Sequence, residues 1–245
     1  MLEKQNSQQE FSTAQAAGKD ISVYVAPNID WDKPLRSVVC VDDNEAFCES
    51  MSRYLADRLS QTIVFKSIWP ECALKLVDGL YIDCLVSDMD MPGMYGDKFI
   101  NAFKIKSPCT FALAITGYSI HAGYLAGQCK ANSFMEKSSA TVLDDILGVV
   151  KQGLDHSRGC IASHCRENYN PEKDAFASAN WRHVKEFKEF TGYSPKEYET
   201  ARRRLKAIAL LMKRRNDKVH LIAGFQSRAR MMKSLEGLLD FKALS

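Results

Sequence analysis

The sequence has no long hydrophobic run. No stretch of 18 apolar residues occurs in the 245-residue chain, whose mean hydropathy is −0.26. A membrane-spanning helix is therefore not expected. The first 20 residues also lack the apolar core that a secretory signal needs. We expect a cytoplasmic protein without a membrane partner.

Paired cysteine motifs are lacking as well. The chain has eight cysteines, but no two follow the CxxC spacing, and most lie in apolar stretches, where a thiol packs as a small hydrophobic group. His156, Cys160, His164 and Cys165 lie close in sequence without the spacing of a zinc site. In the absence of a secretion signal, we expect all thiols to be reduced.

The net charge is small, but the charges are unevenly distributed. Residues 156–245 carry 19 Lys and Arg against 10 Asp and Glu, whereas residues 1–155 carry 14 against 20. An acidic portion followed by a basic one indicates two domains with different partners. The basic portion favours nucleic-acid binding. The alternative is an ordinary solvated surface.

Residues 34–154 alternate between short apolar runs and amphipathic stretches. The runs predict five strands, at 37–41, 62–65, 84–86, 111–115 and 133–135. The amphipathic stretches predict five helices, at 44–60, 71–80, 97–105, 119–128 and 141–153. This alternation indicates an α/β domain with a parallel sheet covered by helices on both faces.

Residues 1–33 precede this pattern. They are rich in Gln, Ser, Ala and Asn and show no periodicity, so we expect a disordered N-terminal arm. Within it, residues 21–25 could form an additional strand.

Polar side chains follow four of the predicted strands. Asp42 and Asp43 come after the first strand, Asp88 after the third, Thr116 after the fourth and Lys137 after the fifth. Ligands of parallel sheets bind at these strand ends. Neighbouring carboxylates repel one another and need a cation, and oxygen ligands select Mg²⁺ or Mn²⁺. A carboxylate beside such a metal can attack phosphorus, with a hydroxyl and an ammonium group on the phosphoryl oxygens.

These residues resemble the signature of the bacterial response-regulator receiver domain. The matching residues are Asp42-Asp43, Asp88-Met-Asp-Met-Pro-Gly-Met-Tyr-Gly96, Thr116-Gly117 and Lys137. The resemblance implies a CheY-like, flavodoxin-like (βα)5 domain with a five-stranded parallel sheet. It also implies phosphorylation by a sensor histidine kinase and allows for a homodimer through the receiver.

The resemblance also assigns roles. It implies that Asp88 accepts the phosphoryl group, that Asp43 ligates Mg²⁺ directly and that Asp42 does so through water. The main-chain carbonyl of Asp90 completes the ligands, and Phe134 takes the place of the switch residue. Thr116 and Lys137 would contact the phosphoryl group. One departure is Ser138, which stands where the family usually has proline after the lysine. Since a non-proline peptide bond strongly prefers trans, we expect an altered loop there.

Residues 155–173 are polar, with Gly and Pro, and read as a linker. Beyond them, we expect short helices at 181–190, 195–214, 219–223 and 226–241. Ser194, Pro195 and Glu197 form a helix-start signal. Short helices in a basic domain suit a helix-turn-helix DNA reader. The alternative is a helical bundle that docks a protein.

The last residues, 174–245, resemble the AraC-type DNA-binding domain. The resemblance rests on Phe190-Thr-Gly-Tyr-Ser-Pro-Lys-Glu-Tyr198, on the Arg-rich segment 202–207, and on the segment from Gly224 to Leu235. It departs from the family in a short first helix-turn-helix unit and in His220, which stands where the family packs alanine.

The DNA contacts follow from this second resemblance. Arg182 and Lys185 in the first unit, and Arg228 and Arg230 in the second, would contact double-stranded DNA. We expect arginines 202–204 on phosphates or in solvent. The sequence thus predicts a phosphorylation-controlled transcription regulator rather than an enzyme, because we find no second catalytic set. The alternative is a receiver whose helical domain docks a protein partner.

Overall fold

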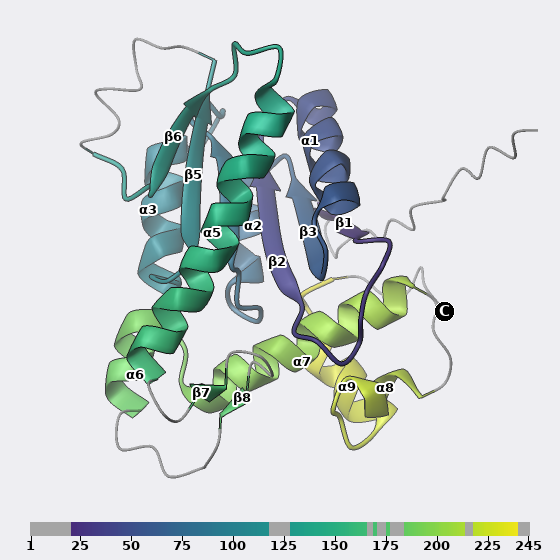
Figure 1. Ribbon diagram of the computed structural model, residues 1–245. Helices are drawn as coiled ribbons and strands as arrows, with labels where there is room; N and C mark the ends of the chain where they lie inside the picture. Colours follow the sequence, from purple (N-terminus) through teal and green to yellow (C-terminus); the bar gives the residue numbers. More distant parts are fainter. Residues whose placement is uncertain are drawn as a thin grey trace, which may run out of the picture.

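The computed structural model describes residues 21–117, 128–165, 169–170, 175–176, 184–213 and 218–239 (Figure 1). Most of the helix predicted at 119–128 lies outside the described residues, as do Arg182 and the first 20 residues of the predicted N-terminal arm. No described helix combines the length and hydrophobicity needed to cross a bilayer.

A six-stranded sheet forms the centre of the protein. Its strands are β1 Ile21–Val25, β2 Arg36–Val41, β3 Thr62–Ser67, β4 Cys84–Asp88, β5 Phe111–Thr116 and β6 Ser133–Glu136. Their order is β1-β3-β2-β4-β5-β6. Strands β2 to β6 are parallel, and four of them, β2 to β5, are almost entirely buried, which fits their continuous apolar character.

Strand β1 makes the sheet mixed rather than purely parallel. It pairs antiparallel with β3, with Val23 opposite Phe65, and Val23 is fully buried. The Tyr24 hydroxyl donates to Glu49 on the following helix. The prediction of five parallel strands was therefore wrong in this respect. Residues 21–33 are not a disordered arm either, because the apolar side chains of 21–25 extend the core.

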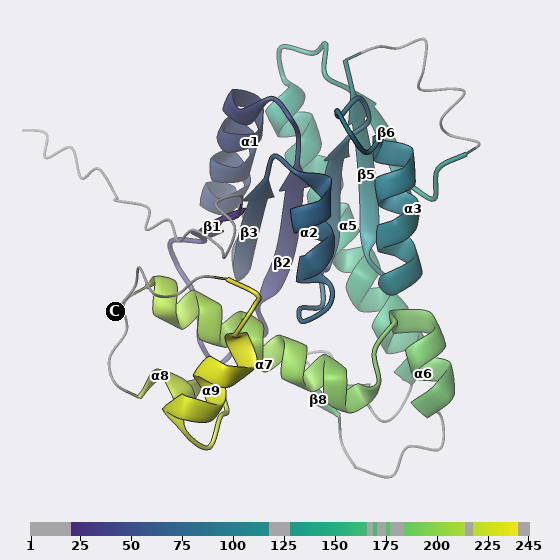
Figure 2. The same ribbon diagram turned by 180° about the vertical axis from the view of Figure 1, so that it is seen from behind.

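In the described part of the chain, two helices cover each face of the sheet (Figures 1 and 2). On one face lie α1 Glu45–Arg58 and α5 Val142–Cys165, and on the other lie α2 Pro70–Leu76 and α3 Gly96–Lys106. The side chain of Asn44 caps α1 by accepting from the Phe47 amide at 3.1 Å.

Helix α5 is longer than the sequence predicted. We expected it to end at Gly153, but it continues to Cys165, so the first part of the predicted linker is helical. Gly153 does not end the helix because it serves close packing instead. A Cβ there would lie 2.5 Å from Phe111 Cδ1 and 3.2 Å from Cys84 Sγ. The glycine lets α5 pass close to β4 and β5.

The described C-terminal helices lie at the opposite end of the sheet from the strand ends that carry the carboxylates (Figure 1). They are α6 Val184–Thr191, α7 Pro195–Met212, α8 Val219–Ile222 and α9 Arg228–Leu235. A short hairpin, β7 Tyr169–Asn170 with β8 Ala175–Phe176, precedes them. The predicted capping box between Ser194 and Glu197 is present at the start of α7.

The C-terminal helices share a hydrophobic core with the sheet. Leu205, Ile208 and Met212 of α7 belong to the same buried cluster as Ile63 of β3 and Leu76 of α2. Lys206 also donates to the carbonyl of Trp31 at 2.6 Å. The helices are thus packed against the α/β domain, and α7 is part of its core.

One cysteine pair corrects the expectation of reduced thiols. Cys109 and Cys160 form a disulfide, with their Cα atoms 6.0 Å apart. The sequence could not show this pair, because 51 residues separate the two cysteines and only the extension of α5 brings them together. Cys160 is therefore not available to a metal site with His156.

Candidate functional site

The carboxyl ends of four parallel strands bring the predicted polar residues to one edge of the sheet. Asp42 and Asp43 follow β2, Asp88 ends β4, Thr116 ends β5 and Lys137 follows β6. The register places Asp88 opposite Ile115 and Thr116 opposite Glu136, so the strand ends lie at similar heights. This edge is uppermost in Figure 1.

Lys137 joins two of the carboxylates. Its Nζ lies 2.8 Å from Asp42 Oδ2 and 2.9 Å from Asp88 Oδ1. Its amide donates to the Thr116 carbonyl at 2.8 Å, and its ammonium lies 5.1 Å from the ring centroid of Phe47. Burial alone lowers the pKa of Lys137, but the hydrogen bonds and charges of Asp42 and Asp88 outweigh it and raise that pKa.

The bond between Lys137 and Ser138 is trans. Ser138 stands where proline is usual, and Lys137 before it still contacts both Asp42 and Asp88. Its effect on the rate of phosphorylation remains a prediction.

Asp42 is a buried carboxylate. Its Oδ1 accepts from the Asn44 amide at 3.0 Å, and its Oδ2 faces Lys137. Burial raises the pKa of Asp42, Lys137 opposes this, and the charge of Asp88 raises the pKa further. A cation at this site would therefore relieve the cost of ionising Asp42.

Asp42, Asp43 and Asp88 form a group that could hold a metal ion. One oxygen of each lies within 4.8 Å of one oxygen of the other two. Asp42 and Asp88 are buried, whereas Asp43 is exposed and has no ion pair among the described residues. An all-oxygen donor set of this kind suits Mg²⁺ or Mn²⁺.

The loop after β4 fixes the orientation of Asp88. The Met89 amide donates to Asp88 Oδ1 at 2.8 Å, and the Gly96 amide donates to the Met89 carbonyl at 3.0 Å. A Cβ on Gly96 would lie 2.2 Å from the Asp88 carbonyl oxygen. The glycine in the sequence motif is therefore required because the first turn of α3 packs directly on the end of β4.

Asp90 has a contact that the sequence did not suggest. The Thr116 hydroxyl donates to Asp90 Oδ2 at 3.3 Å. We predicted a role only for the main-chain carbonyl of Asp90, and its metal ligation stays a prediction. Phe134 is half-buried, opposite Ala114 on β5, and packs against the core on the α3 face. Its role as a switch also stays a prediction.

The predicted DNA-contacting residues that the structure describes lie on helices at the opposite end of the sheet from this site (Figure 1). Arg228 and Arg230 are exposed at the start of α9, and Lys185 is exposed on α6, where it lies 3.8 Å from Glu189. Arg182 lies outside the described residues. The three described residues, Lys185, Arg228 and Arg230, do not form one cluster with the carboxylates.

Two arginines of α7 contradict our expectation of phosphate or solvent contact. Arg202 Nη1 lies 3.0 Å from the buried Asp83 Oδ2, and Arg204 Nη1 donates to the Gly79 carbonyl at 3.1 Å. Both face the α/β domain because α7 lies against the sheet. Arg203, between them, lies 3.6 Å from Glu199 on the exposed side.

Comparison with known proteins identifies the α/β part. Residues 38–147 match the family model of the response regulator receiver domain. These residues form a receiver domain of two-component signalling with a flavodoxin-like fold. The match ends before the C-terminal helices, which it does not describe. No protein of curated function matches the chain.

Solved structures similar to this chain include receiver domains. A CheY-like receiver domain protein from Methanospirillum hungatei shares 19% identity over 51% of this chain and 98% of its own, with a TM-score of 0.45. The response regulator TrrA from Thermotoga maritima, solved with Mg²⁺ and BeF, shares 21% over 49% and 100%, with a TM-score of 0.43. The beryllofluoride-activated NtrC4 receiver dimer shares 26% over 49% and 98%, with a TM-score of 0.41.

Proposed function

We propose that this protein is a two-component response regulator that a sensor histidine kinase phosphorylates on Asp88 and that acts on transcription by binding double-stranded DNA. The proposed phosphorylation of Asp88 rests on the position of Lys137, whose Nζ lies 2.8 Å from Asp42 Oδ2 and 2.9 Å from Asp88 Oδ1. A lysine so placed can neutralise a phosphoryl group on Asp88 as it forms.

The geometry at Asp88 indicates which oxygen attacks. Among the described residues, Lys137 and the Met89 amide both contact Oδ1 of Asp88. Oδ2 then attacks the phosphorus of a phosphohistidine, a P–O bond forms and the P–N bond breaks. The electron pair of the P–N bond returns to the imidazole, and the product is an acyl phosphate on Asp88. Thr116, at the end of β5, would donate a hydrogen bond from its hydroxyl to a phosphoryl oxygen.

The acidic group fits a divalent cation. Asp42, Asp43 and Asp88, with the main-chain carbonyl of Asp90, would hold Mg²⁺ or Mn²⁺, and the buried Asp42 supplies a charge that needs a counterion. When bound, the cation neutralises charge on the phosphoryl oxygens. Asp43 would bind the cation directly, because its carboxylate is exposed and forms no ion pair with Lys137.

Helix α9 supports DNA binding as the output. Arg228, Arg230 and Lys233 are all exposed on this helix and have no ion pair among the described residues. Ser227 caps the helix by accepting from the Arg230 amide at 3.2 Å. An exposed arginine near the start of a helix can reach a guanine edge in the major groove. This arrangement agrees with the AraC-type resemblance.

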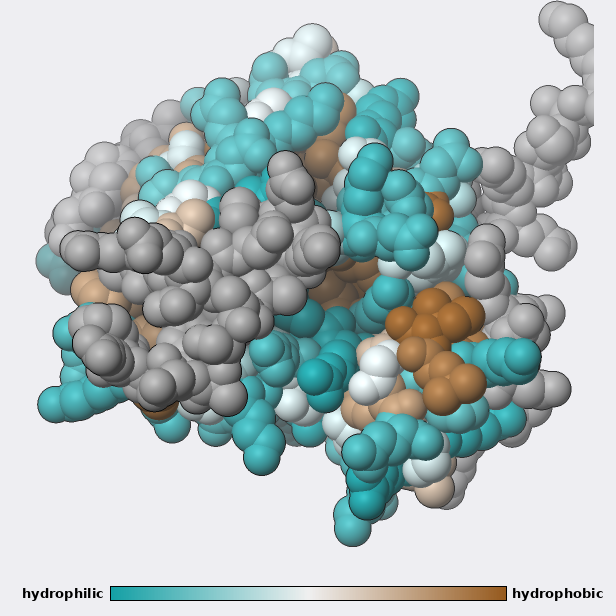
Figure 3. Space-filling model, turned by 60° about the horizontal axis from the view of Figure 1, so that its bottom comes forward, coloured by the Kyte–Doolittle hydropathy of each residue, from teal (hydrophilic) through white to brown (hydrophobic). Residues whose placement is uncertain are grey.

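Exposed apolar residues favour a second candidate, docking of a protein partner. Leu221 and Ile222 on α8 and Met232 on α9 are exposed. Figure 3 shows an apolar patch surrounded by hydrophilic surface on the underside of the protein. Apolar surface of this kind is typical of protein interfaces. A further candidate interaction is a homodimer in which the receiver domains of two copies of the chain contact each other.

Phosphorylation is tested with a small phosphodonor and Mg²⁺, with the intact mass as readout. We expect the wild type to gain one phosphoryl group and Asp88→Asn to gain none. Asp90→Asn is the matched control on the same loop and should still be labelled. Labelling that persists in Asp88→Asn and disappears in Asp90→Asn would assign the phosphoacceptor to Asp90.

The metal site is tested by titrating Mg²⁺ by calorimetry. Asp43→Ala should weaken binding more than Asp42→Ala, because one carboxylate binds directly and the other through water. Lys137→Ala should leave Mg²⁺ binding intact and uncouple phosphorylation from the output. Unchanged binding in both aspartate variants would contradict the assigned ligands.

DNA binding is tested with the full chain, since α7 is part of the receiver core and a C-terminal fragment would lose it. Arg228→Ala should weaken binding to a selected site by about 1–3 kcal/mol and spare most binding to random duplex. The control is Lys151→Ala, an exposed lysine on α5. If the full chain binds no duplex at low salt, the protein-docking function replaces the DNA-binding one.

A further inference from the structure

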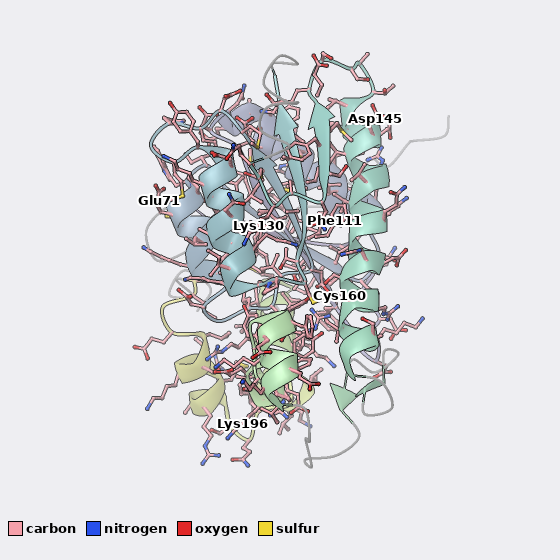
Figure 4. All side chains as sticks on the ribbon, turned by 90° about the vertical axis from the view of Figure 1, so that its left-hand side faces the viewer. Glu71, Phe111, Lys130, Asp145, Cys160 and Lys196 are labelled. Carbon is pink, nitrogen blue, oxygen red and sulfur yellow. A yellow bond between two sulfur atoms is a disulfide. The ribbon has the colours of Figure 1, made fainter. Side chains whose placement is uncertain are left out.

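The disulfide between Cys109 and Cys160 lies where the receiver meets the C-terminal helices. Cys109 is in the loop before β5, at the end of the sheet away from Asp88, and Cys160 is on the extension of α5. Figure 4 shows Cys160 below Phe111, at the level where the sheet gives way to α6. The disulfide therefore links the loop before β5 to the part of α5 that extends beyond the sheet.

The disulfide borders an aromatic cluster that spans this boundary. Cys109 is buried in one hydrophobic cluster with Tyr81 of the receiver, Phe187 of α6 and Tyr198 of α7. The ring of Tyr81 lies 4.9 Å from that of Tyr198, edge to face, and Phe187 meets Tyr198 at 5.9 Å. Tyr193 adds a hydrogen bond from its hydroxyl to the Leu80 carbonyl at 2.8 Å.

The extension of α5 contacts the same cluster. Ser157, about one helical turn before Cys160, shares a 2.9 Å hydrogen bond with the Tyr81 hydroxyl. Ile161, the next residue after Cys160, is fully buried in the cluster. The disulfide thus holds the segment that packs Ser157 and Ile161 onto the interface between the receiver and helices α6 and α7.

We propose that Cys109 and Cys160 are a redox-responsive modification site, whose oxidation tightens the interface between the receiver and the C-terminal helices and whose reduction loosens it. Cys160 is half-exposed, so a small thiol or disulfide can reach its sulfur, and Cys109 is buried. An accessible disulfide is the labile kind.

Three of the other buried thiols are poor competitors for this oxidation. Cys40, Cys48 and Cys84 form no disulfide in the described part of the chain. Burial raises the pKa of Cys40 to about 12 and also raises the pKa values of Cys48 and Cys84. These three thiols stay protonated, and a protonated thiol does not attack a disulfide.

Oxidation proceeds by thiol–disulfide exchange with oxidised glutathione. The Cys160 thiolate attacks one sulfur of the small disulfide, forms a mixed disulfide and releases one glutathione thiolate. Cys109, deprotonated, attacks Cys160 Sγ and releases the second. The two protein thiols lose two electrons, glutathione disulfide gains them, and the two thiol protons pass to the released thiolates.

The first experiment is a redox titration of the full chain in glutathione buffers of graded potential, quenched by alkylation and analysed by peptide mass spectrometry. We expect a peptide pair joined through Cys109 and Cys160 that appears and disappears reversibly. Absence of this pair at every potential, or pairing of either cysteine with another thiol, would overturn the proposal.

The second experiment measures amide hydrogen exchange of the oxidised and reduced forms. Reduction should raise exchange in residues 155–163 and 187–201 by roughly tenfold or more and leave α3 unchanged. Cys160→Ser should match the reduced form even under oxidising conditions, and the control Cys72→Ser on α2 should match the wild type. Equal exchange in oxidised and reduced wild type would overturn the proposal. Neither readout depends on phosphorylation or DNA binding.

Discussion

Arg202 of α7 forms an ion pair with Asp83 across the boundary between the C-terminal helices and the receiver, with 3.0 Å between Nη1 and Oδ2. Asp83 is fully buried just before β4, and its other oxygen lies 3.1 Å from Arg36 Nη1. The amide and hydroxyl of Ser37 also donate to it. A buried carboxylate needs such partners because its desolvation is costly. Helix α7 thus completes a polar network inside the receiver.

Removal of Arg202 should destabilise the whole protein. Arg202→Ala leaves Asp83 buried with one cationic partner fewer, so we expect a loss of about 2–4 kcal/mol in the free energy of unfolding. Urea unfolding measures it. The neighbouring Arg203→Ala is the control, since its pair with Glu199 is exposed and worth less than about 0.5 kcal/mol. Equal losses would show that the network does not hold α7 in place.

Gly192 should tolerate substitution far less than Gly237. Both have positive φ, at +82° and +79°, so alanine costs each about 1 kcal/mol of backbone strain. A Cβ on Gly192 would also lie 1.8 Å from the Lys106 carbonyl oxygen, whereas nothing lies within 4 Å of one on Gly237. Gly192→Ala should therefore lower the thermal midpoint by several degrees more than Gly237→Ala. Similar midpoints in a melting experiment would contradict the close approach of the α6–α7 turn to α3.

Local patterns predicted most of the receiver but not how the C-terminal helices are attached to it. The capping of α1 by Asn44 and the capping box of Ser194 could be read from residues three positions apart. The partners of Asp83 could not, because Arg202 follows it by 119 residues and looks like any other arginine of a basic helix. Cys109 and Cys160 are also far apart in sequence, by 51 residues, so no local pattern indicated that they form a disulfide.

The carboxylate site was predictable because topology forces its residues together. Asp42, Asp88 and Lys137 each follow a short apolar run, and parallel strands end at one edge. The sequence suggested an additional strand at residues 21–25 but not its place as the sixth strand of the sheet, because the antiparallel pairing with β3 depends on tertiary contacts. The contact of Thr116 with the Asp90 side chain depends on the loop conformation, which spacing does not encode.

Glu49 should contribute stability at neutral pH that is lost in acid. Burial by itself raises the pKa of Glu49, but hydrogen bonds from Lys66, Tyr24 and Arg53 lower it overall to about 2. Since the folded pKa lies below the ordinary value of 4.5, the contribution is present above pH 4.5 and is lost as pH falls toward 2. Glu49→Gln should flatten the pH dependence of the free energy of unfolding in that window.

A neighbouring glutamate provides the control for Glu49. Glu45 also faces Lys66, at 3.4 Å, but its side chain is 72% exposed. Glu49→Gln should cost about 1–2 kcal/mol at pH 7, because the buried Lys66 loses its closer partner. Glu45→Gln should cost less than about 0.5 kcal/mol. Chemical denaturation of the two variants at pH 7 and pH 3 distinguishes them, and a larger loss in Glu45→Gln would contradict this assignment.

Asp42→Asn should stabilise the metal-free protein at neutral pH. Burial raises the pKa of Asp42 in the folded state, so the folded protein binds a proton there more tightly than the unfolded chain does. The stability that this protonation contributes is present at low pH and is lost as pH rises through the raised pKa. Asparagine removes the cost of the buried charge, so we expect a gain of about 0.5–2 kcal/mol at pH 7 that fades toward pH 4. Thermal unfolding in the presence of a chelator measures it.

Adding Mg²⁺ should reverse the order of stability of wild type and Asp42→Asn, because a cation bound by the carboxylates stabilises the wild type by mass action and the variant has lost one of those carboxylates. A variant that is less stable than the wild type without metal would mean that the attraction between Asp42 and Lys137 outweighs the desolvation of the carboxylate.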